Sequence, residues 1–325
     1  MPKLRGCYNS LQDMAQESLG RYSYLQCLSC GSIQIEPIPD SKDWEKLYPK
    51  NYFTHSTFSI SKSNTKSGIQ NFLDSLRENI LHSGFGYNRG GSTKCCFFSS
   101  LLAKIPILRT WASAPLAYLP YVPHGRLLDI GCGNGDFLIR MQTLGWNCEG
   151  IELDDLAVQL CRSRGLRVKQ QAIEDLELEP ESYDAIVLSH VIEHISEPEE
   201  LLSKLSHALN DTGTLVCISP NPLGLLSRFF REHWRALDVP RHFVLPSPNG
   251  YISLMSKVGL QATIRTSQRI GRWNYFESLG LKRGNTESIG SNFLQRFVIQ
   301  VILSTFSMIV PNSGEEIICI ARKGL

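Results

Sequence analysis

The sequence predicts an α/β protein whose core is a mostly parallel sheet with helices on both faces. From Arg126 onward, short apolar runs that are typical of buried strands alternate with amphipathic segments of helical length. A glycine-rich turn directly follows the first of these strands. Parallel strands need crossover connections, and these are right-handed, so the alternation predicts a doubly wound sandwich.

The elements follow from hydrophobic periodicity and from the turn residues between the runs. We expect strands at 126–131, 147–152, 166–170, 183–189, 213–219, 260–267 and 315–322. We expect helices at 135–145, 154–165, 198–209 and 247–259, and a further one at 68–83. Prolines 106, 115 and 120 divide the apolar stretch 95–122 into short helices. The expected domains are a ribbon-like segment (1–57), a linker and helical connector (58–122) and the sheet domain (123–325), with insertions at 222–245 and 271–312.

Composition excludes several classes of protein. The chain has 325 residues, of which 42% are hydrophobic and 20% charged, so extensive disorder is not expected. A net charge of +2 gives no electrostatic case for nucleic-acid binding. Ten cysteines in a chain of this length do not indicate a disulfide scaffold, and no apolar run follows the basic residues near the N-terminus. We therefore expect a reduced, cytoplasmic protein, and we predict no oligomeric state.

The segment 293–310 is apolar enough to be compared with a membrane span. Arg296, Gln300, Ser304 and Ser307 recur on it at helical spacing and form a polar stripe. A membrane-spanning helix would carry an interior arginine only at a cost of a few kcal/mol. We expect a core or interface helix and no membrane span, with peripheral attachment to a membrane as an open alternative.

Two signals at the ends of the first two strands point to a nucleoside-containing cofactor. Gly131, Gly133 and Gly135 follow the first strand and permit close approach of a ligand to the backbone. Glu152 ends the second strand, where a carboxylate can accept both ribose hydroxyls. The spacing is G-x-G-x-G, and Asp136 stands where the dinucleotide fingerprint has glycine, which disfavours a dehydrogenase.

Five segments together resemble the class I S-adenosylmethionine-dependent methyltransferases: LLDIGCGNGDF, GIELDD, YDAIVLSHVIEHI, LNDTGTLVCISPN and the closing EEIICIARK. The resemblance implies a Rossmann-like sheet of seven strands whose last strand is antiparallel and lies next to the fifth. It implies that Asp129 and the glycine turn hold the methionine part and Glu152 the ribose. The acid that often follows the third strand is displaced here to Glu174 and Asp175. The expected cofactor-binding residues are Asp129, Gly131, Cys132, Gly133, Gly135, Glu152, Leu153, Ala172, Ile173, Ser189 and His190.

The run His190-Val-Ile-Glu193-His194 follows the fourth strand and matches the inverted zincin pattern H-x-x-E-H. That enzyme carries the motif on a long helix, whereas here it starts at a strand end and Pro198 follows closely, so we reject a metalloprotease. The segment resembles a subset related to quinone-biosynthesis O-methyltransferases, which implies that an acid and a histidine can hold a divalent ion. His190 or His194 as general base or substrate-orienting group, and a purely structural role, remain the alternatives.

The segment after the fifth strand, 219–248, is rich in arginine and resembles the W-x-x-L-D-x-P-R-H stretch of one bacterial branch of these enzymes. We expect Trp234, Arg241 and His242 to contact the acceptor, with Glu193 nearby and His242 in a catalytic role. Arginines in this loop favour an anionic or sugar-like acceptor, although a solvated helix face explains them equally well.

The N-terminal cysteines offer half of a zinc knuckle. Cys27 and Cys30 have the C-x-x-C spacing, and Cys7 precedes them without a fourth cysteine. Zinc held by Cys7, Cys27 and Cys30, with His55 as a further ligand, is one interpretation. A degenerate ribbon held by packing of Tyr22, Tyr24 and Ile35 is the favoured one.

The sequence therefore predicts a methyltransferase that uses S-adenosyl-L-methionine on a small-molecule acceptor. O-methylation is favoured, and the acceptor classes are a saccharide, a lipid precursor or a quinone-like phenol. The alternative is a catalytically inactive protein that binds the cofactor and acts as a partner or regulator.

Overall fold

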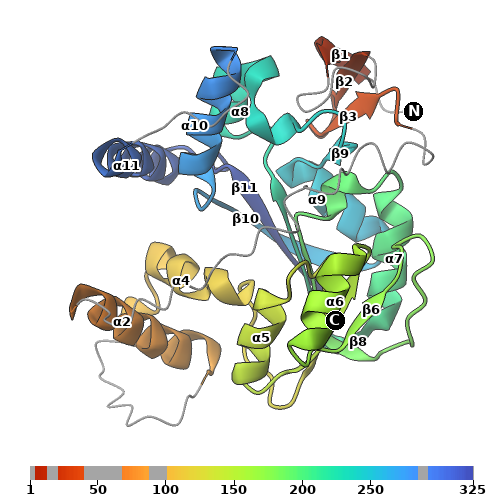
Figure 1. Cartoon of the computed structure of the whole chain (residues 1–325), viewed down its shortest axis with the longest axis vertical. Helices are drawn as coiled ribbons and strands as arrows, with labels where there is room; N and C mark the ends of the chain where they lie inside the picture. Colours follow the sequence, from red (N-terminus) through yellow and green to blue (C-terminus); the bar gives the residue numbers. More distant parts are fainter. Residues whose placement is uncertain (1–3, 13–20, 40–67, 88–100, 285–291, 325) are drawn as a thin grey trace. The chain divides into compact units, whose positions relative to one another are not determined.

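The structure is a computed structural model that describes residues 4–12, 21–39, 68–87, 101–284 and 292–324. Its main feature is one mixed sheet of seven strands, which confirms the predicted fold class (Figure 1). The closing strand lies beside the fifth strand of the domain and runs antiparallel to its other neighbour. The strands stand in the order β10 (Leu260–Ser267), β11 (Glu316–Lys323), β8 (Leu209–Pro220), β7 (Tyr183–Ser189), β4 (Arg126–Ile130), β5 (Asn147–Glu152) and β6 (Val168–Gln170).

The chain divides into two compact units, and we describe each by itself. Unit 1 comprises Met1–Lys50, Leu188–Ser206 and Cys217–Leu325, and unit 2 comprises Asn51–Val187 and His207–Val216.

Unit 2 contains the parallel strands β4, β5 and β6, with Asp129 paired to Gly150 and Ile130 to Ile151. Helices α5 (Asp136–Thr143) and α6 (Asp155–Ser163) pack on β5, and the Asp154 carboxylate caps α6 by accepting from the Ala157 amide at 2.8 Å. Gly150 permits the close packing of α5, because a Cβ there would lie 2.8 Å from Leu138 Cδ1. Helix α2 (Gly68–Phe85) packs on α4 (Pro106–Ser113), which the short 3-10 helix η3 (Ala114–Leu116) continues.

Unit 1 contains a second, antiparallel sheet in the order β1-β2-β3-β9. Its strands are β1 (Leu4–Gln12), β2 (Arg21–Cys27), β3 (Ile33–Glu36) and the short β9 (Val244–Leu245). Tyr22, Tyr24 and Ile35 of this sheet are buried in one apolar cluster with Trp234 and Phe230. The N-terminal strands thus pack on the segment that follows β8, and Figure 1 shows β3 beside β9.

The described part of unit 1 also contains short and long helices. They are η4 (Ile192–His194), α7 (Pro198–Ala208, whose last residues belong to unit 2), α8 (Leu225–Phe230), η5 (Arg231–His233), η6 (Arg235–Leu237), α9 (Pro248–Lys257), α10 (Gly271–Lys282) and α11 (Phe293–Ile309).

Most expected elements are present with small shifts at their ends. The helix expected at 135–145 begins at Asp136 and ends at Thr143, and the strand expected at 213–219 is extended to Leu209–Pro220. Across the described residues, no helix combines the length and the apolar character that crossing a membrane requires. Residues 40–67, which include His55, and 88–100 lie outside the described ranges.

Candidate functional site

The glycine turn after β4 adopts the backbone that its residues predict. Gly131, Gly133 and Gly135 have φ of 69°, 52° and 78°, a region that side chains with a Cβ rarely enter. The position that a Cβ on Gly133 would take has no atom within 4 Å, whereas a Cβ on Gly135 would lie 2.3 Å from Leu166 Cδ1. Gly133 therefore leaves open space beside the turn, and Gly135 is required by packing as well as by conformation.

Glu152 is held by the backbone at the end of β5. Its Oε2 accepts from the Gly133 amide at 2.8 Å, and its Oε1 accepts from the amides of Leu153 and Asp154 at 2.8 and 3.0 Å. Two carboxylate oxygens offer about four acceptor positions, so capacity remains for hydroxyl donors. The carboxylate is thereby oriented beside the turn. Of its neighbours, Leu153 exposes 55% of its surface, which leaves that side chain accessible to a ligand.

Asp129 is the second acid of this site, and it is 4% exposed. Burial, together with the charge of Glu152, raises the pKa of the Asp129 carboxyl to about 8. A cation that binds beside Asp129 would stabilise the ionised carboxylate. Cys132 lies beside it, also buried, and its amide and that of Gly131 donate to the Ile151 carbonyl at 3.1 and 2.8 Å.

Ala172 and Ile173 follow β6 and are half-buried, and Glu174 and Asp175 are exposed. Gln171, which sequence reasoning missed, lies directly between β6 and these residues. Its amide donates to the Glu152 carbonyl at 3.2 Å, and its buried side-chain Oε1 has no hydrogen-bond partner in the described part of the chain. An unsatisfied buried acceptor next to the predicted adenine positions makes Gln171 a further candidate for cofactor binding.

His190 in unit 1 follows Ser189, the half-buried last residue of β7, and has a φ of 58°. Its Nδ1 lies 3.3 Å from Glu193 Oε1, and its Nε2 lies 3.1 Å from Glu316 Oε1. Both carboxylate side chains are fully buried, whereas the imidazole is one-third exposed. Burial alone would lower the pKa of His190, but hydrogen bonds to the two carboxylates outweigh it and raise the pKa to about 9.

Glu316 completes this group, and no motif in the sequence pointed to it. Arg269 Nη2 donates to its Oε1 at 2.7 Å, and the Ser267 hydroxyl donates to its Oε2 at 2.8 Å. Burial would raise the pKa of Glu316, yet the His190 hydrogen bond and the Arg269 charge lower it to about 2. His190 is thus an imidazolium between two carboxylates at neutral pH, with both ring nitrogens donating.

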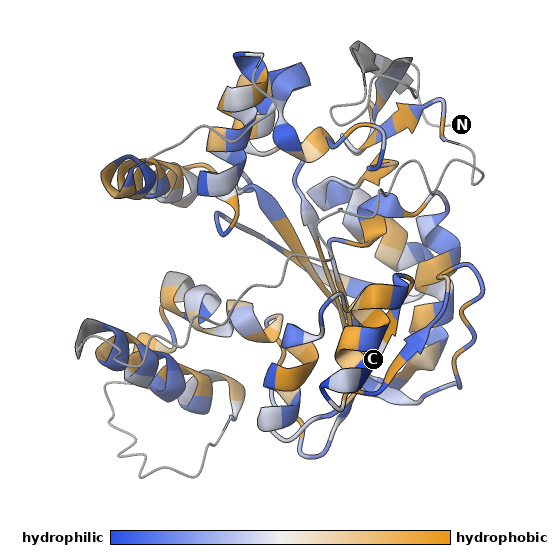
Figure 2. Cartoon of the chain, viewed as in Figure 1, coloured by the Kyte–Doolittle hydropathy of each residue, from blue (hydrophilic) through white to orange (hydrophobic). Residues whose placement is uncertain are grey.

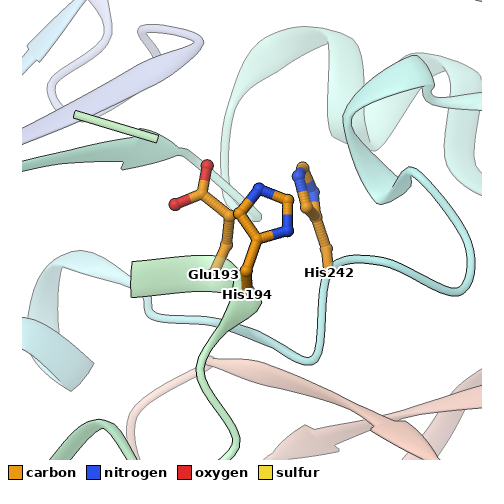
Figure 3. Close-up of side chains that lie close together, drawn as sticks. All are labelled: Glu193, His194 and His242. Carbon is orange, nitrogen blue, oxygen red and sulfur yellow. The ribbon is translucent and has the colours of Figure 1, made fainter. Parts of the chain in front are cut away.

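Glu193, His194 and His242 converge at one place in unit 1 (Figure 3). A potential ligand atom of each lies within 4.8 Å of the other two. His194 Nδ1 lies 3.0 Å from the Arg241 carbonyl, and His242 Nδ1 lies 2.8 Å from the Ala236 carbonyl. Carbonyl oxygens only accept hydrogen bonds, so each Nδ1 carries a proton, and Nε2 is the nitrogen of each ring that could bind a metal ion or a proton.

The fully buried Glu193 brings a charge to this group. Its Oε2 has no hydrogen-bond partner among the described residues. Burial lowers the pKa of His242 to about 4, so this imidazole is neutral at physiological pH. Carboxylate and neutral imidazole are common ligands of divalent transition metals. The hydrogen bonds from each Nδ1–H to a backbone carbonyl hold the two imidazole rings in one orientation, as such hydrogen bonds do in metal sites.

Trp234 and Arg241, predicted as acceptor contacts, are engaged within the protein. Trp234 is fully buried, and its indole N–H donates to Glu315 Oε2 at 3.3 Å. Arg241 donates from Nε and Nη2 to the two oxygens of Asp238 at 3.0 and 2.7 Å. Arg235 also contacts Asp238 at 2.7 Å. The W-x-x-L-D-x-P-R-H stretch is therefore held together by its own ion pairs, although exposed Arg228 and Arg231 keep part of the loop cationic.

Tyr24 joins this loop to the N-terminal sheet. Its hydroxyl lies 2.8 Å from the Leu237 carbonyl and 2.7 Å from the His242 carbonyl. A phenol has one proton to share between these acceptors, and burial raises the pKa of Tyr24, which keeps that proton in place. The N-terminal sheet thereby fixes the backbone on which His242 stands.

The N-terminal cysteines form separate contacts. Cys7 Sγ donates to the Tyr24 carbonyl at 3.2 Å, Cys27 Sγ lies 2.9 Å from Ser29 Oγ, and Cys30 Sγ donates to Ser32 Oγ at 3.3 Å. The Ser29 hydrogen bond lowers the pKa of Cys27 to about 7. Within the ranges that the structure describes, these cysteines belong to no group of three metal-ligating side chains, so zinc gains no support there.

A family model described as "Methyltransferase domain" matches residues 106–263. Among curated proteins, the chain is 32% identical over 107 residues to a "Ubiquinone biosynthesis O-methyltransferase" of Xanthomonas campestris pv. campestris (strain B100), covering 31% of the chain and 45% of that protein. A protein of the same name from Cereibacter sphaeroides (strain ATCC 17025 / ATH 2.4.3) is 27% identical over 167 residues, covering 47% and 65%. The chain thus spans less than half the length of the first of these relatives.

Solved structures give likenesses of low identity. A "SAM dependent methyltransferase from Archaeoglobus fulgidus" is 21% identical with a TM-score of 0.46, covering 75% of this chain and 98% of that one. An "S-adenosylmethionine dependent methyltransferase from Mesorhizobium loti" is 16% identical with a TM-score of 0.47, covering 66% and 97%.

Proposed function

We propose that this chain, whose residues 106–263 belong to the methyltransferase-domain family, is an S-adenosylmethionine-dependent methyltransferase acting on a small-molecule acceptor. The observation that carries the proposal is the site of the buried Asp129, the positive-φ glycine turn and the backbone-held Glu152. Asp129 provides a buried anion for the methionine ammonium group, and Glu152 provides acceptors for the ribose hydroxyls.

The chemistry requires little covalent participation by the protein. The bond between the donor sulfur and its methyl carbon breaks as a bond from the acceptor to that carbon forms, and the products are S-adenosylhomocysteine and the methylated acceptor. An oxygen acceptor also loses a proton, which needs a base of suitable pKa. His190 does not suit this role, since both of its nitrogens donate to carboxylates.

We assign proton acceptance to Nε2 of His194, because its Nδ1–H is committed to the Arg241 carbonyl, whereas the low pKa of His242 makes that ring a weaker base, which packs edge-on against His194. Glu193 lies beside both rings and stabilises the imidazolium that forms. The imidazolium of His190 stays charged throughout and keeps Glu193 ionised through its hydrogen bond to Oε1.

A divalent cation is the alternative use of the same three side chains, because an Nε2 that coordinates a metal cannot also accept a proton. The unpartnered Glu193 Oε2 and the two Nε2 lone pairs offer three ligands, a set that resembles metal sites with an open position. Such an ion, when bound, would lower the pKa of an acceptor hydroxyl that coordinates it. Glu193, His194 and His242 would hold the ion, and Arg241 and Ala236 would orient the two imidazoles through their carbonyls.

A quinone-like phenol is our preferred acceptor, and O-methylation our preferred reaction. The curated relatives are named ubiquinone biosynthesis O-methyltransferases, and this supports a phenolic oxygen over a saccharide or another lipid precursor. Buried Trp234 and Arg241 are already engaged inside the protein, so they no longer argue for an anionic or sugar-like acceptor.

The test is formation of S-adenosylhomocysteine by the purified chain with polyprenylated catechols, simple saccharides and lipid precursors as acceptors. We expect turnover with the catechols. The assay is carried out with added Mn²⁺ and again after treatment with a chelator. Turnover that persists after chelation supports the histidine base, and turnover that requires Mn²⁺ supports the bound ion. Replacing His194→Ala or His242→Ala should reduce kcat by about a hundredfold and leave the cofactor Kd unchanged. His207→Ala, at an exposed histidine of α7, is the matched control.

The results separate the proposal from its alternative. Cofactor binding without turnover on any acceptor class would favour the inactive, cofactor-binding partner protein. Turnover that is unchanged in both the His194 and the His242 variants would refute the assignment of the base. Failure to bind S-adenosylmethionine or S-adenosylhomocysteine would refute the proposed function as a whole.

A further inference from the structure

Helix α11 turns its polar residues toward the protein. Gln300 Nε2 donates to the Gln268 carbonyl at 3.1 Å and lies 3.2 Å from Ser304 Oγ. Leu303 on the same side is 3% exposed, and Ile299 packs against the buried apolar cluster of unit 1. Gln300, Ser304 and Ser307 of the polar stripe are therefore half-buried, whereas Arg296, the fourth residue of the stripe, is exposed.

Most of the exposed side chains of α11 are apolar, and Figure 2 colours much of this helix as hydrophobic. Phe293 exposes 82% of its surface and Ile309 exposes 73%. Arg296 is the one charged residue within the helix. Monomeric soluble proteins rarely expose a contiguous apolar surface of this kind without a binding role. The exposed apolar side chains of α11, which we call the α11 face, are Phe293, Leu294, Phe297, Val298, Val301, Ile302, Phe306, Met308 and Ile309.

The exposed charged side chains of α10 and α11 are cations. In the described residues from 225 to 324, Glu232 is the only acid among the exposed charged side chains. Helix α10 packs on α11 and exposes Arg272 and Lys282. The exposed charged side chains of the two packed helices are Arg272 and Lys282 on α10 and Arg296 on α11, and the one acid of these two helices, Glu277 on α10, is half-buried.

We propose that the α11 face docks on an anionic lipid bilayer, with the helix lying in the plane of the interface. An apolar face with cationic residues around it is complementary to a surface whose outer layer is anionic and whose interior is apolar. A second copy of this chain fits the surroundings less well, because a two-fold contact would bring like charges together. The helix, of 17 residues, is about 25 Å long and supports attachment rather than crossing.

The test is flotation of the full chain with vesicles of phosphatidylcholine alone or with one-third phosphatidylglycerol. We expect binding to the anionic vesicles that weakens as salt is raised, and little binding to the neutral ones. The double substitution Phe297→Ser and Ile302→Ser should weaken binding by about tenfold for each side chain. Arg272→Gln with Lys282→Gln should weaken it by about fivefold for each charge.

The matched control is Ile252→Ser, which removes an exposed apolar side chain from α9 and should leave binding unchanged. Circular dichroism and the Kd for S-adenosylhomocysteine verify that each variant is folded, and they also keep this proposal separate from the proposed function. Wild-type protein that does not bind anionic vesicles in the flotation assay would overturn the proposal. So would a wild-type dimer in light scattering that dissociates in the Phe297/Ile302 variant, which would assign the face to a second copy.

Discussion

The charge state of Asp129 predicts a pH dependence of cofactor binding. Its carboxyl has a pKa raised to about 8, compared with an ordinary value of about 4, because it is buried and lies near the charge of Glu152. In the empty protein at pH 7 it is mostly protonated. Binding the cationic methionine group needs the ionised form, so the Asp129 proton must leave when the cofactor binds.

The magnitude follows from this linkage. Below pH 8 the apparent affinity should rise about tenfold for each pH unit, because the fraction of ionised Asp129 rises by that factor. Above pH 8 the amino group of the ligand, with an ordinary pKa near 8, loses its charge. The affinity for S-adenosylhomocysteine should therefore pass through a maximum near pH 8.

Calorimetric titration from pH 6 to pH 9, in two buffers of different ionisation enthalpy, measures both the Kd and the proton released. Asp129→Asn should bind more weakly at pH 8 and should lose the slope below it. Asp136→Asn changes an acid at the start of α5 and should retain that slope. A Kd that is constant between pH 6 and pH 8, or a slope that survives in Asp129→Asn, would refute the reasoning.

Three further predictions concern stability. Gly135→Ala should lower the free energy of unfolding by about 3 kcal/mol in urea titrations, because the backbone φ is strained for alanine and the new Cβ would lie 2.3 Å from Leu166 Cδ1. The control is Gly165→Ala, where φ is +77° but no atom lies within 4 Å, and it should lower the free energy of unfolding by about 1 kcal/mol. Equal losses in the two variants would exclude the packing argument. Asp238→Asn should lower the free energy of unfolding by about 3 kcal/mol, because it removes the carboxylate charge that pairs with buried Arg241, and a loss below about 1 kcal/mol would show that this charge pair is not needed. Burial raises the pKa of Glu315 to about 7, above its value in the unfolded chain, so the free energy of unfolding should fall as pH rises from about 4.5 to 7. Glu315→Gln should flatten this pH dependence. An unchanged pH dependence in the variant would show that another group causes it.

The sheet was predictable because its signals are local. The strands expected at 147–152, 183–189 and 260–267 have those bounds in the structure, since apolar runs between turn residues mark them. The four helices expected after Arg126 were predicted one to two residues too long at their C-terminal ends, because periodicity continues past the last intrahelical hydrogen bond, whereas the helix expected at 68–83 continues to Phe85. The cofactor strand and turn were predictable for the same reason, as glycines at a strand end report a conformation that few residues adopt.

The partners of His190 were not predictable in full. Glu193 lies three residues away and was visible in the motif, whereas Glu316 comes from the closing strand, 126 residues later. Which side of β11 carries Glu316 depends on pairing register, and a shift of one residue would direct Glu315 there instead. Sequence reasoning therefore left His190 open as a general base, a substrate-orienting group or a structural residue, whereas the two carboxylates raise its pKa to about 9 and favour the imidazolium.

The same placement of acids explains how a chain of net charge +2 has a cationic surface in its C-terminal part. Asp238, Glu315 and Glu316 are all buried there, and two of them are counterions of arginines. Burial removes these acids from the surface, so Glu232 is the one exposed acid among the described residues from 225 to 324, while Arg272, Lys282 and Arg296 stay exposed on α10 and α11. The net charge of the chain is thus a poor guide to what a given surface binds, because acidic side chains can be buried while basic side chains remain exposed.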